Sequence, residues 1–167
     1  MTRDEKFKAP LDRIEDFDFG SETARVFDDM LDRSIPFYPE IQRMIGEIAA
    51  DFATPGSRIY DLGCSTGTTL IQLDPVVAPA VELIGIDASP DMLAVARDKL
   101  TVAGLSHRWQ LICGQLEQTL DLSQASVVIM NLTLQFVRPL YRDRLIQTIV
   151  QGLETDGCLL LVEKVLG

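Results

Sequence analysis

The sequence predicts an α/β fold built on a doubly wound, mainly parallel sheet. Short apolar segments alternate along the chain with segments whose apolar residues recur at helical spacing, a pattern typical of parallel strands joined by helices. The apolar segments are nearly continuous, as expected for strands that helices cover on both faces. Strands are expected at 58–62, 81–87, 109–113, 126–131 and 158–163, and the helices between them at 67–73, 90–103 and 139–153.

Two further helices are expected before the first strand. The first covers about residues 22–31 and places four apolar side chains on one face. Pro36-Phe37-Tyr38-Pro39 interrupts it, and Pro39 suits the first turn of the next helix. Thr54-Pro55-Gly56 ends that helix. Its apolar residues follow a helical period and are Ile41, Met44, Ile45, Ile48 and Phe52.

Composition limits the class of protein. The 167 residues suffice for one domain with its own core, and the net charge is −10. Nucleic-acid binding draws on basic groups, so we expect a small-molecule partner and no direct contact with nucleic acid. The chain has no apolar run long enough for a membrane span and no signal-peptide core, which favours a cytoplasmic protein. The three cysteines show no metal spacing, His107 is interpreted as a surface residue, and no metal is expected.

The most informative segment is the turn Asp61-Leu62-Gly63-Cys64-Ser65-Thr66-Gly67. A glycine turn between a strand and a helix exposes backbone N–H groups beside the strand end, which suits a nucleotide or an adenosyl ligand. The spacing differs from the dinucleotide pattern G-x-G-x-x-G. It has the form of the first motif of S-adenosylmethionine (SAM)-dependent methyltransferases, with Ser65 at the middle glycine. For this motif alone, a tight turn without a ligand is the alternative.

A second feature favours the adenosyl site. Asp87 ends the second expected strand, where an acid some twenty to thirty positions after a glycine turn holds a ribose in doubly wound folds. A carboxylate can accept both ribose hydroxyl protons in charge-assisted hydrogen bonds. Ser89 and Pro90 then suit the N-cap and first position of a helix. Taken alone, Asp87 could also be a solvated loop acid.

Further motifs identify a resemblance to one family. They are Phe27-x-x-Met30, Arg33-Ser34-Ile35-Pro36-x-Tyr38, Ile86-Asp87-x-Ser89-Pro90-x-Met92, Asn131-x-Thr133-Leu134-Gln135-Phe136 and Gln151-Gly152-Leu153. With the glycine turn, they make the chain similar to the carboxy-S-adenosyl-L-methionine (carboxy-SAM) synthases, from about residue 7 to residue 164. The resemblance implies a transferase with the Rossmann-like fold of class I SAM-dependent methyltransferases. It also implies SAM or carboxy-SAM as the bound ligand.

The resemblance implies a reaction in which a carboxyl unit derived from prephenate is transferred to the methyl carbon of SAM, with release of phenylpyruvate. Carboxy-SAM then serves the modification of the tRNA wobble uridine, and the enzyme itself need not contact tRNA. Two alternatives stay open. The chain could be a SAM-dependent methyltransferase that acts on a small molecule, or a SAM-binding module without turnover.

The resemblance also implies where the ligand lies. It puts Tyr38 at the donor group, Gly63, Cys64 and Ser65 around the amino-acid part, Asp87 and Ala88 at the ribose and adenine, Gln115 and Leu116 at the adenine, and Asn131 at the end of the fourth strand. No catalytic residue is assigned. As alternatives, Tyr38 could only brace the start of its helix, and Asn131 could only cap a turn.

Two departures from the family are visible. Gln115 follows Gly114 where the family carries an aspartate for the adenine amino group, and a neutral acceptor binds it less strongly. Family members also continue beyond Glu163-Lys164 with further helices, two strands and an arginine for the substrate carboxylate. We therefore expect a C-terminally shortened chain, with an N-terminal lid or helical segment over 1–55 and a SAM-binding domain over 56–167 in one structural unit. An exposed last strand favours a homo-oligomer, such as a homodimer, and poor turnover of prephenate is expected.

Overall fold

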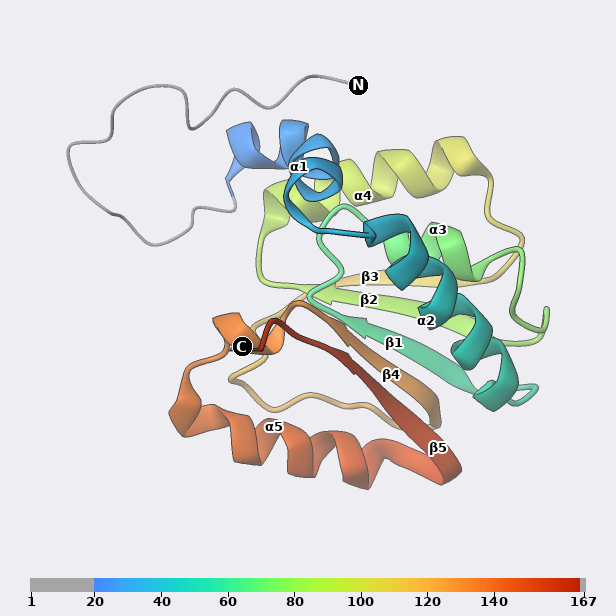
Figure 1. Ribbon diagram of the computed structural model, residues 1–167. Helices are drawn as coiled ribbons and strands as arrows, with labels where there is room; N and C mark the ends of the chain where they lie inside the picture. Colours follow the sequence, from blue (N-terminus) through green and yellow to red (C-terminus); the bar gives the residue numbers. More distant parts are fainter. Residues whose placement is uncertain (1–19, 166–167) are drawn as a thin grey trace.

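A computed structural model of the chain, which describes residues 20–165, has the predicted fold class (Figure 1). All strand pairs in its single five-stranded sheet are parallel. The strands are β1 (Arg58–Leu62), β2 (Glu82–Asp87), β3 (Trp109–Cys113), β4 (Ala125–Asn131) and β5 (Leu153–Val162). The helices are α1 (Ser21–Ser34), α2 (Tyr38–Phe52), α3 (Thr68–Leu73), α4 (Pro90–Ala103) and α5 (Pro139–Gly152), with a short 3₁₀ helix, η1 (Leu134–Phe136).

The order of the strands fixes where a ligand can bind. The sheet runs β3-β2-β1-β4-β5, so the chain first builds outward from β1 on one side and then crosses to β4 on the other. The connections that leave β1 and β4 therefore diverge at the carboxyl ends of these strands. Such a switch point opens a crevice beside the strand ends, which is the usual ligand site of open α/β sheets.

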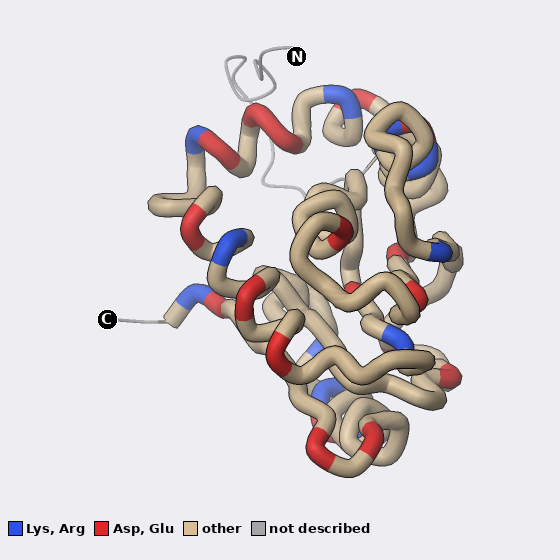
Figure 2. Tube along the Cα trace, turned by 90° about the vertical axis from the view of Figure 1, so that its right-hand side faces the viewer, with Lys and Arg blue, Asp and Glu red and all other residues tan. Residues whose placement is uncertain are grey.

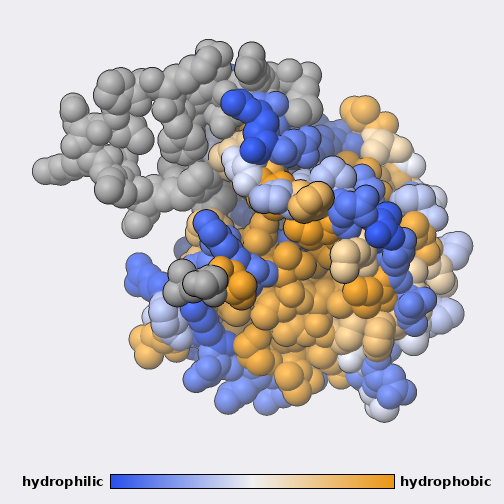
Figure 3. All heavy atoms as spheres, in the orientation of Figure 1, coloured by the Kyte–Doolittle hydropathy of each residue, from blue (hydrophilic) through white to orange (hydrophobic). Residues whose placement is uncertain are grey.

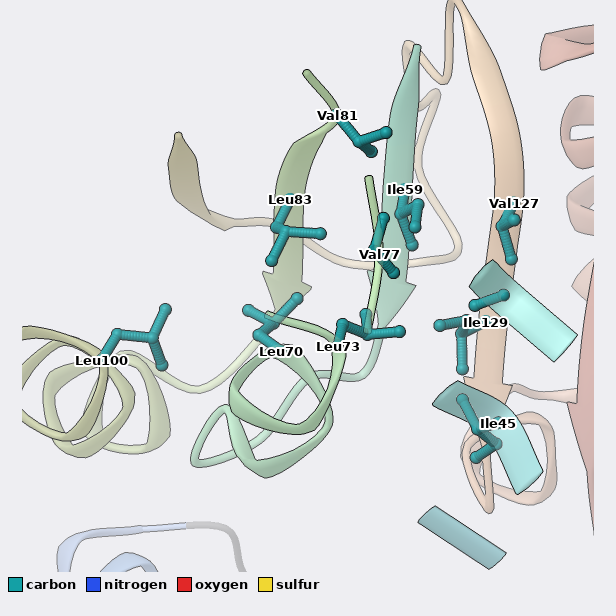
Figure 4. Packing of buried hydrophobic residues seen from close by; sticks show 11 residues of the cluster. Ile45, Ile59, Leu70, Leu73, Val77, Val81, Leu83, Leu100, Val127 and Ile129 are labelled. Atoms are coloured by element: carbon teal, nitrogen blue, oxygen red, sulfur yellow. The ribbon is translucent and has the colours of Figure 1, made fainter. Parts of the chain in front are cut away.

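The sheet has a hydrophobic core on each face. On one face α2, α3 and α4 cover the strands through side chains such as Ile45, Leu70 and Leu100, all at most 3% exposed (Figures 1 and 4). On the other face α5 contributes Leu145 and Ile149. Successive β1 residues, Ile59 and Tyr60, belong to the two different cores, as the twofold alternation of strand side chains requires. The near-continuous apolar strands are explained by this double cover.

Helix α1 belongs to neither core. It packs on α4 through a separate small cluster in which Ala24 and Phe27 of α1 meet Met92 of α4. The connection to α2 passes through Phe37, which has φ 58° and is 79% exposed. A bulky residue in the left-handed region is strained. Residues 1–19 lie outside the described residues, so the predicted segment 1–55 is described only from residue 20.

The structure differs from the sequence predictions at the start of the last strand. The last strand was expected at 158–163, whereas β5 begins at Leu153. Ala125 pairs with Leu153, yet Val127 pairs with Cys158, so the intervening residues of β5 bulge out of register. Asp156 has φ 67° in this bulge. Asp156 and Gly157 are residues typical of turns, and here they form an irregularity inside the strand. Such irregularities are common at sheet edges.

The prediction that His107 is a surface residue is wrong. Its side chain is 1% exposed. Nδ1 lies 2.8 Å from Oδ1 of Asp74, and Nε2 lies 2.9 Å from the carbonyl oxygen of Ala78. Asp74 also accepts the backbone N–H groups of Ser106 and His107, and these hydrogen bonds lower its pKa against the effect of burial. The polar sequence context reflects this local network instead of exposure to solvent.

Candidate ligand-binding site

A cavity of about 570 Å³ opens at the carboxyl ends of β1, β2 and β4. Its floor is the glycine turn after β1, and its walls come from α1, the start of α2 and the segment after β4. The volume lies within the range of small-molecule sites in proteins. The cavity therefore occupies the crevice that the strand order predicts.

The glycine turn can form only with its glycines in place. Gly63 has φ 77°, and a Cβ there would lie 2.5 Å from the Thr133 side chain. Gly67 has φ 78°, and a Cβ there would lie 2.5 Å from Leu100. Ser65 also adopts a positive φ, 49°, which costs a residue with a side chain about 1 kcal/mol. The turn thus brings backbone of Gly63, Cys64 and Ser65 to the cavity surface.

Asp87 connects the end of β2 to this turn. Its Oδ2 accepts the backbone N–H of Ser65 and its Oδ1 accepts that of Ser89, both at 2.9 Å. Burial raises the pKa of Asp87, while these two hydrogen bonds favour the ionised form and act in the opposite direction. The carboxylate lines the cavity and keeps lone pairs available for further donors. The geometry therefore fits a contact to ribose hydroxyls and also stabilises the strained Ser65.

Asp61 is the residue that the sequence reasoning missed. It lies at the carboxyl end of β1, lines the cavity and is 2% exposed, and its Oδ2 has no hydrogen-bond partner within residues 20–165. Burial, together with the neighbouring charge of Asp87, raises the pKa of Asp61 to about 7. A buried carboxylate without a partner is unfavourable until a cation or a donor meets it. The sequence could have pointed to Asp61, because it is the first residue of the glycine-turn segment Asp61–Gly67.

Tyr38 at the start of α2 and Asn131 at the end of β4 both line the cavity. The Tyr38 hydroxyl accepts a hydrogen bond of 2.8 Å from Nε2 of Gln42, and burial raises the pKa of Tyr38 to about 12. The hydroxyl proton of Tyr38 stays available as a donor. Oδ1 of Asn131 is buried and has no hydrogen-bond partner in the described part of the chain. Both residues can therefore offer polar atoms to a ligand, a neutral donor from Tyr38 and an amide from Asn131.

The structure brings together eight of the nine residues that the resemblance placed at the ligand. They are Tyr38, Gly63, Cys64, Ser65, Asp87, Ala88, Leu116 and Asn131. Gln115 is exposed and lies instead in a neighbouring depression of about 400 Å³, with Ala88, Glu117, Arg138 and Tyr141. The lining residues that sequence reasoning did not single out include Asp61, the apolar side chains Phe27, Met30 and Leu31 of α1, and Thr133.

The cavity has an acidic lining. Asp61, Asp87, Asp91 and Glu117 contribute to it, and none of the described lining residues is a lysine, arginine or histidine. Carboxylates around a partly enclosed cavity favour a cationic ligand. SAM carries a sulfonium and an α-ammonium group, so the unpartnered Asp61 and the acidic lining fit it. Within residues 20–165 no cluster of three or more His, Cys, Asp or Glu side chains has the arrangement of a metal site. No helix in that range is long and apolar enough to cross a membrane.

The parallel sheet, its glycine turn and the acid after β2 define a domain of the class I SAM-dependent methyltransferase superfamily. A family model described as a methyltransferase domain matches residues 59–157. A Methanococcus maripaludis structure of the SAM-dependent methyltransferase type superposes with a TM-score of 0.70 at 18% identity, covering 88% of this chain and 65% of that one. At that identity the likeness shows the fold.

Curated relatives narrow the family. A carboxy-SAM synthase from Methylococcus capsulatus is 54% identical over 168 residues, which cover 100% of this chain and 69% of the relative. One from Trichlorobacter lovleyi is 43% identical over 164 residues, which cover 97% of this chain and 67% of the relative. The chain belongs to the carboxy-S-adenosyl-L-methionine synthase family.

Proposed function

We propose that the protein works as a carboxy-SAM synthase, which uses SAM and prephenate to form carboxy-SAM and phenylpyruvate. The observation that carries the proposal is Asp61, a buried carboxylate whose Oδ2 has no hydrogen-bond partner among the described residues, in a cavity of about 570 Å³ and in a chain 54% identical to a carboxy-SAM synthase. SAM supplies the methyl group that accepts the carboxyl unit. The residues of the chain then have to bind SAM, orient it and keep water from it.

In this proposal each part of SAM has its own residues. Asp61 meets the cationic amino-acid end, and the backbone of Cys64 and Ser65 lies beside it. Asp87 accepts the ribose hydroxyls, with the adenine next to Ala88 and Leu116. Tyr38 and Asn131 lie at the donor group. Support comes from the cavity, which all of these residues line, and from the polar atoms of Asp61 and Asn131 that lack partners.

The apolar wall suits a reaction that water would disturb. Phe27, Met30 and Leu31 of α1 and Phe136 of η1 line the cavity. Displacing water strengthens electrostatic interactions inside a site and protects a reactive group from hydrolysis or protonation. We propose that α1 supplies this water exclusion.

A methyltransferase that acts on a small molecule is the second candidate. The observation in its favour is the acidic lining, because prephenate carries two carboxylates and the described lining offers no basic side chain to hold them. Under the first proposal, the cation for prephenate has to come from outside the described lining residues.

Mass spectrometry of the ligand that copurifies with the protein distinguishes the candidates. Carboxy-SAM in the denatured extract is the expected result, and it supports the synthase. SAM or S-adenosylhomocysteine without carboxy-SAM favours the methyltransferase. Failure of the purified protein to bind added SAM or carboxy-SAM in calorimetry contradicts both.

We also propose a cytoplasmic protein that acts as a homo-oligomer and leaves tRNA binding to another protein. Cys64, Cys113 and Cys158 are free thiols in the structure, which is typical of a reducing compartment. Acids outnumber lysine and arginine by 25 to 15, and the two kinds are interspersed along the trace in Figure 2. The excess of acids and the interspersed charges do not suit a surface that binds nucleic acid.

A further inference from the structure

We propose that Asp28 and Lys99 are positioning residues that couple the cavity wall formed by α1 to the turn that contacts the ligand. The inference rests on the proposed function in one respect, that the cavity binds SAM or carboxy-SAM. Four residues from separate parts of the fold build this coupling, and we call them the α1 latch: Asp28 of α1, Thr66 of the glycine turn, Thr68 of α3 and Lys99 of α4.

The α1 latch is a closed hydrogen-bond network. Oδ1 of Asp28 accepts the hydroxyl protons of Thr66 at 2.6 Å and Thr68 at 3.3 Å. Nζ of Lys99 donates to Oδ2 of Asp28 at 2.5 Å, to Thr68 at 2.9 Å and to Thr66 at 3.2 Å. Each threonine hydroxyl thus uses its single proton toward Asp28 and a lone pair toward Lys99. All three donors of the ammonium group have an acceptor.

The latch joins two parts of the cavity lining. Phe27, Met30 and Leu31 of α1 form one wall, and Thr66 and Thr68 lie in the floor. Asp28 follows Phe27 directly, so movement of the wall away from the floor has to break the hydrogen bonds of Asp28. A ligand on the turn and the position of α1 are therefore linked through the same two threonines.

Helix α1 lies outside the two cores of the sheet. Among the described residues, the apolar cluster that includes α1 is centred on Ala24, Phe27 and Met92, and α1 leads into α2 through the exposed, strained Phe37. The side chains of Lys99 and Asp28 are 28% and 36% exposed. A partly exposed ion pair adds little to global stability. Its loss should therefore act on ligand exchange more than on folding.

The test uses the full chain and SAM as the probe. Lys99→Met removes the donor and keeps much of the side-chain volume, and Asp28→Asn removes the carboxylate. We expect each to raise the rate of SAM dissociation about tenfold, as expected for losing a charge-assisted contact, with a melting temperature close to that of the wild type. The double variant should be no worse than either single variant, because both act through one network. Lys99→Arg, which keeps the charge and donors, should restore slow dissociation.

Arg43→Met is the matched control. Arg43 pairs with Glu40 on α2 at 2.8 Å, and this exposed pair does not include the threonines of the turn. Its removal should leave the dissociation rate unchanged. Wild-type rates in Lys99→Met, or equal effects of Arg43→Met and Lys99→Met, would overturn the latch while SAM binding itself stands. A wild-type chain that binds no SAM would overturn the proposed function as well.

Hydrogen exchange on the wild type gives a second readout that needs no variant. Amides of α1 should exchange more slowly when SAM is added, although α1 lies outside both cores of the sheet. Protection limited to the glycine turn and α4, with α1 unchanged, would show that the wall is not coupled to the ligand.

Discussion

Asp61 is a buried carboxyl group in the lining of the cavity. Burial raises its pKa to about 7, so near neutral pH the carboxyl group is only partly ionised before a ligand arrives. A cationic ligand interacts favourably with the ionised form alone. The pKa of Asp61 should therefore fall when SAM binds, and SAM binding should release a proton near pH 7.

This linkage predicts how SAM affinity depends on pH. Affinity should rise from about pH 6 to about pH 8 and then level off, because Asp61 has to lose its proton first. Asp61→Asn should bind SAM more weakly and without this slope. The stability of the free protein should change in the opposite sense. A carboxyl group whose folded-state pKa is raised contributes most stability below its usual pKa of 3.8, and this contribution is lost as pH rises to about 7.

Calorimetry across this pH range, with melting temperatures at pH 8, measures both effects. At pH 8 the free Asp61→Asn variant should melt above the wild type, because it has lost a buried charge without a partner. A pH-independent SAM affinity in the wild type would show that Asp61 does not face the cation.

Asp87 accepts the backbone N–H groups of Ser65 and Ser89 and is proposed to hold the ribose of SAM. Two substitutions of Asp87 can separate these roles. Asp87→Ala removes the acceptors of Ser65 and Ser89, whereas Asp87→Asn keeps one oxygen for them. Each lost charge-assisted hydrogen bond to the ribose costs roughly 1.5–3 kcal/mol, so SAM affinity should fall at least tenfold in both variants. Stability should fall mainly in Asp87→Ala. Equal SAM affinities of wild type and Asp87→Asn in calorimetry would mean that Asp87 does not hold the ribose.

Sequence reasoning located residues at the cavity where their place in space follows from their position in the chain. Asp87 and Ser65 were found because the ends of parallel strands meet at one edge of a sheet. His107 failed because its burial depends on Asp74, a residue 33 positions earlier. Gln115 and Leu116 are neighbours in sequence, yet only the conformation after β3 decides which of them lines the cavity. Which side chain lines the cavity depends on the backbone conformation, and the types of the neighbouring residues do not determine it.

At the scale of the elements, the strands followed their apolar pattern closely. β1 and β3 have the predicted bounds, and α4 runs from Pro90 to Ala103 as expected from its N-cap Ser89 and the following Gly104. The predicted first helix was too short, since α1 spans Ser21–Ser34. Its polar ends carry no apolar periodicity, and the last turn is held by polar contacts such as the backbone hydrogen bond from Ile35 N–H to Leu31 and the ion pair of Arg33 with Asp29. Local periodicity cannot register such an extension.

The edge position of β5 predicts self-association of this chain. β5 is the last strand in the order and its outer side has no strand partner among the described residues. Hydrophobic side chains gather on the face that carries α2 and β5 (Figure 3). Met44, Ile48 and Phe52 of α2 and Leu161 of β5 are exposed. Apolar edges of this kind favour pairing with another chain. Light scattering should show a mass that grows with protein concentration.

Two substitutions test whether the β5 edge is the surface through which the chains associate. Leu161→Lys places a charge on β5 at a side chain that is 46% exposed and should shift the equilibrium toward monomer. Val102→Lys is the control, since Val102 is 88% exposed on α4, which packs beside β2 and β3 at the opposite end of the sheet. A wild-type monomer at every concentration would contradict the prediction, and equal effects of the two substitutions would place the contact elsewhere.

For the whole molecule, the ligand crevice was predictable and its charge was not. The order of apolar segments and one glycine turn are enough to place a crevice at the carboxyl ends of β1 and β4. The four acids that line it come from three separate segments: the end of β1, the end of β2 with the start of α4, and the segment after β3. Their convergence depends on tertiary structure. The four acids make the cavity suited to cations. The net charge of −10 shows that the chain is acidic, but it does not show where on the molecule the acids gather.

The acidic lining leads to a prediction about turnover. A dicarboxylate such as prephenate needs lysine or arginine in its pocket, and the described lining provides four acids and none of these. We expect this 167-residue chain to bind SAM about as tightly as the Methylococcus capsulatus relative does and to release phenylpyruvate from prephenate much more slowly. Calorimetry with SAM and a phenylpyruvate assay on both proteins, at equal concentration and pH, measure the two quantities. SAM affinity serves as the internal control for an intact cavity. Equal phenylpyruvate release by the two proteins would contradict the prediction and would mean that a cation from beyond the described lining reaches prephenate in this chain.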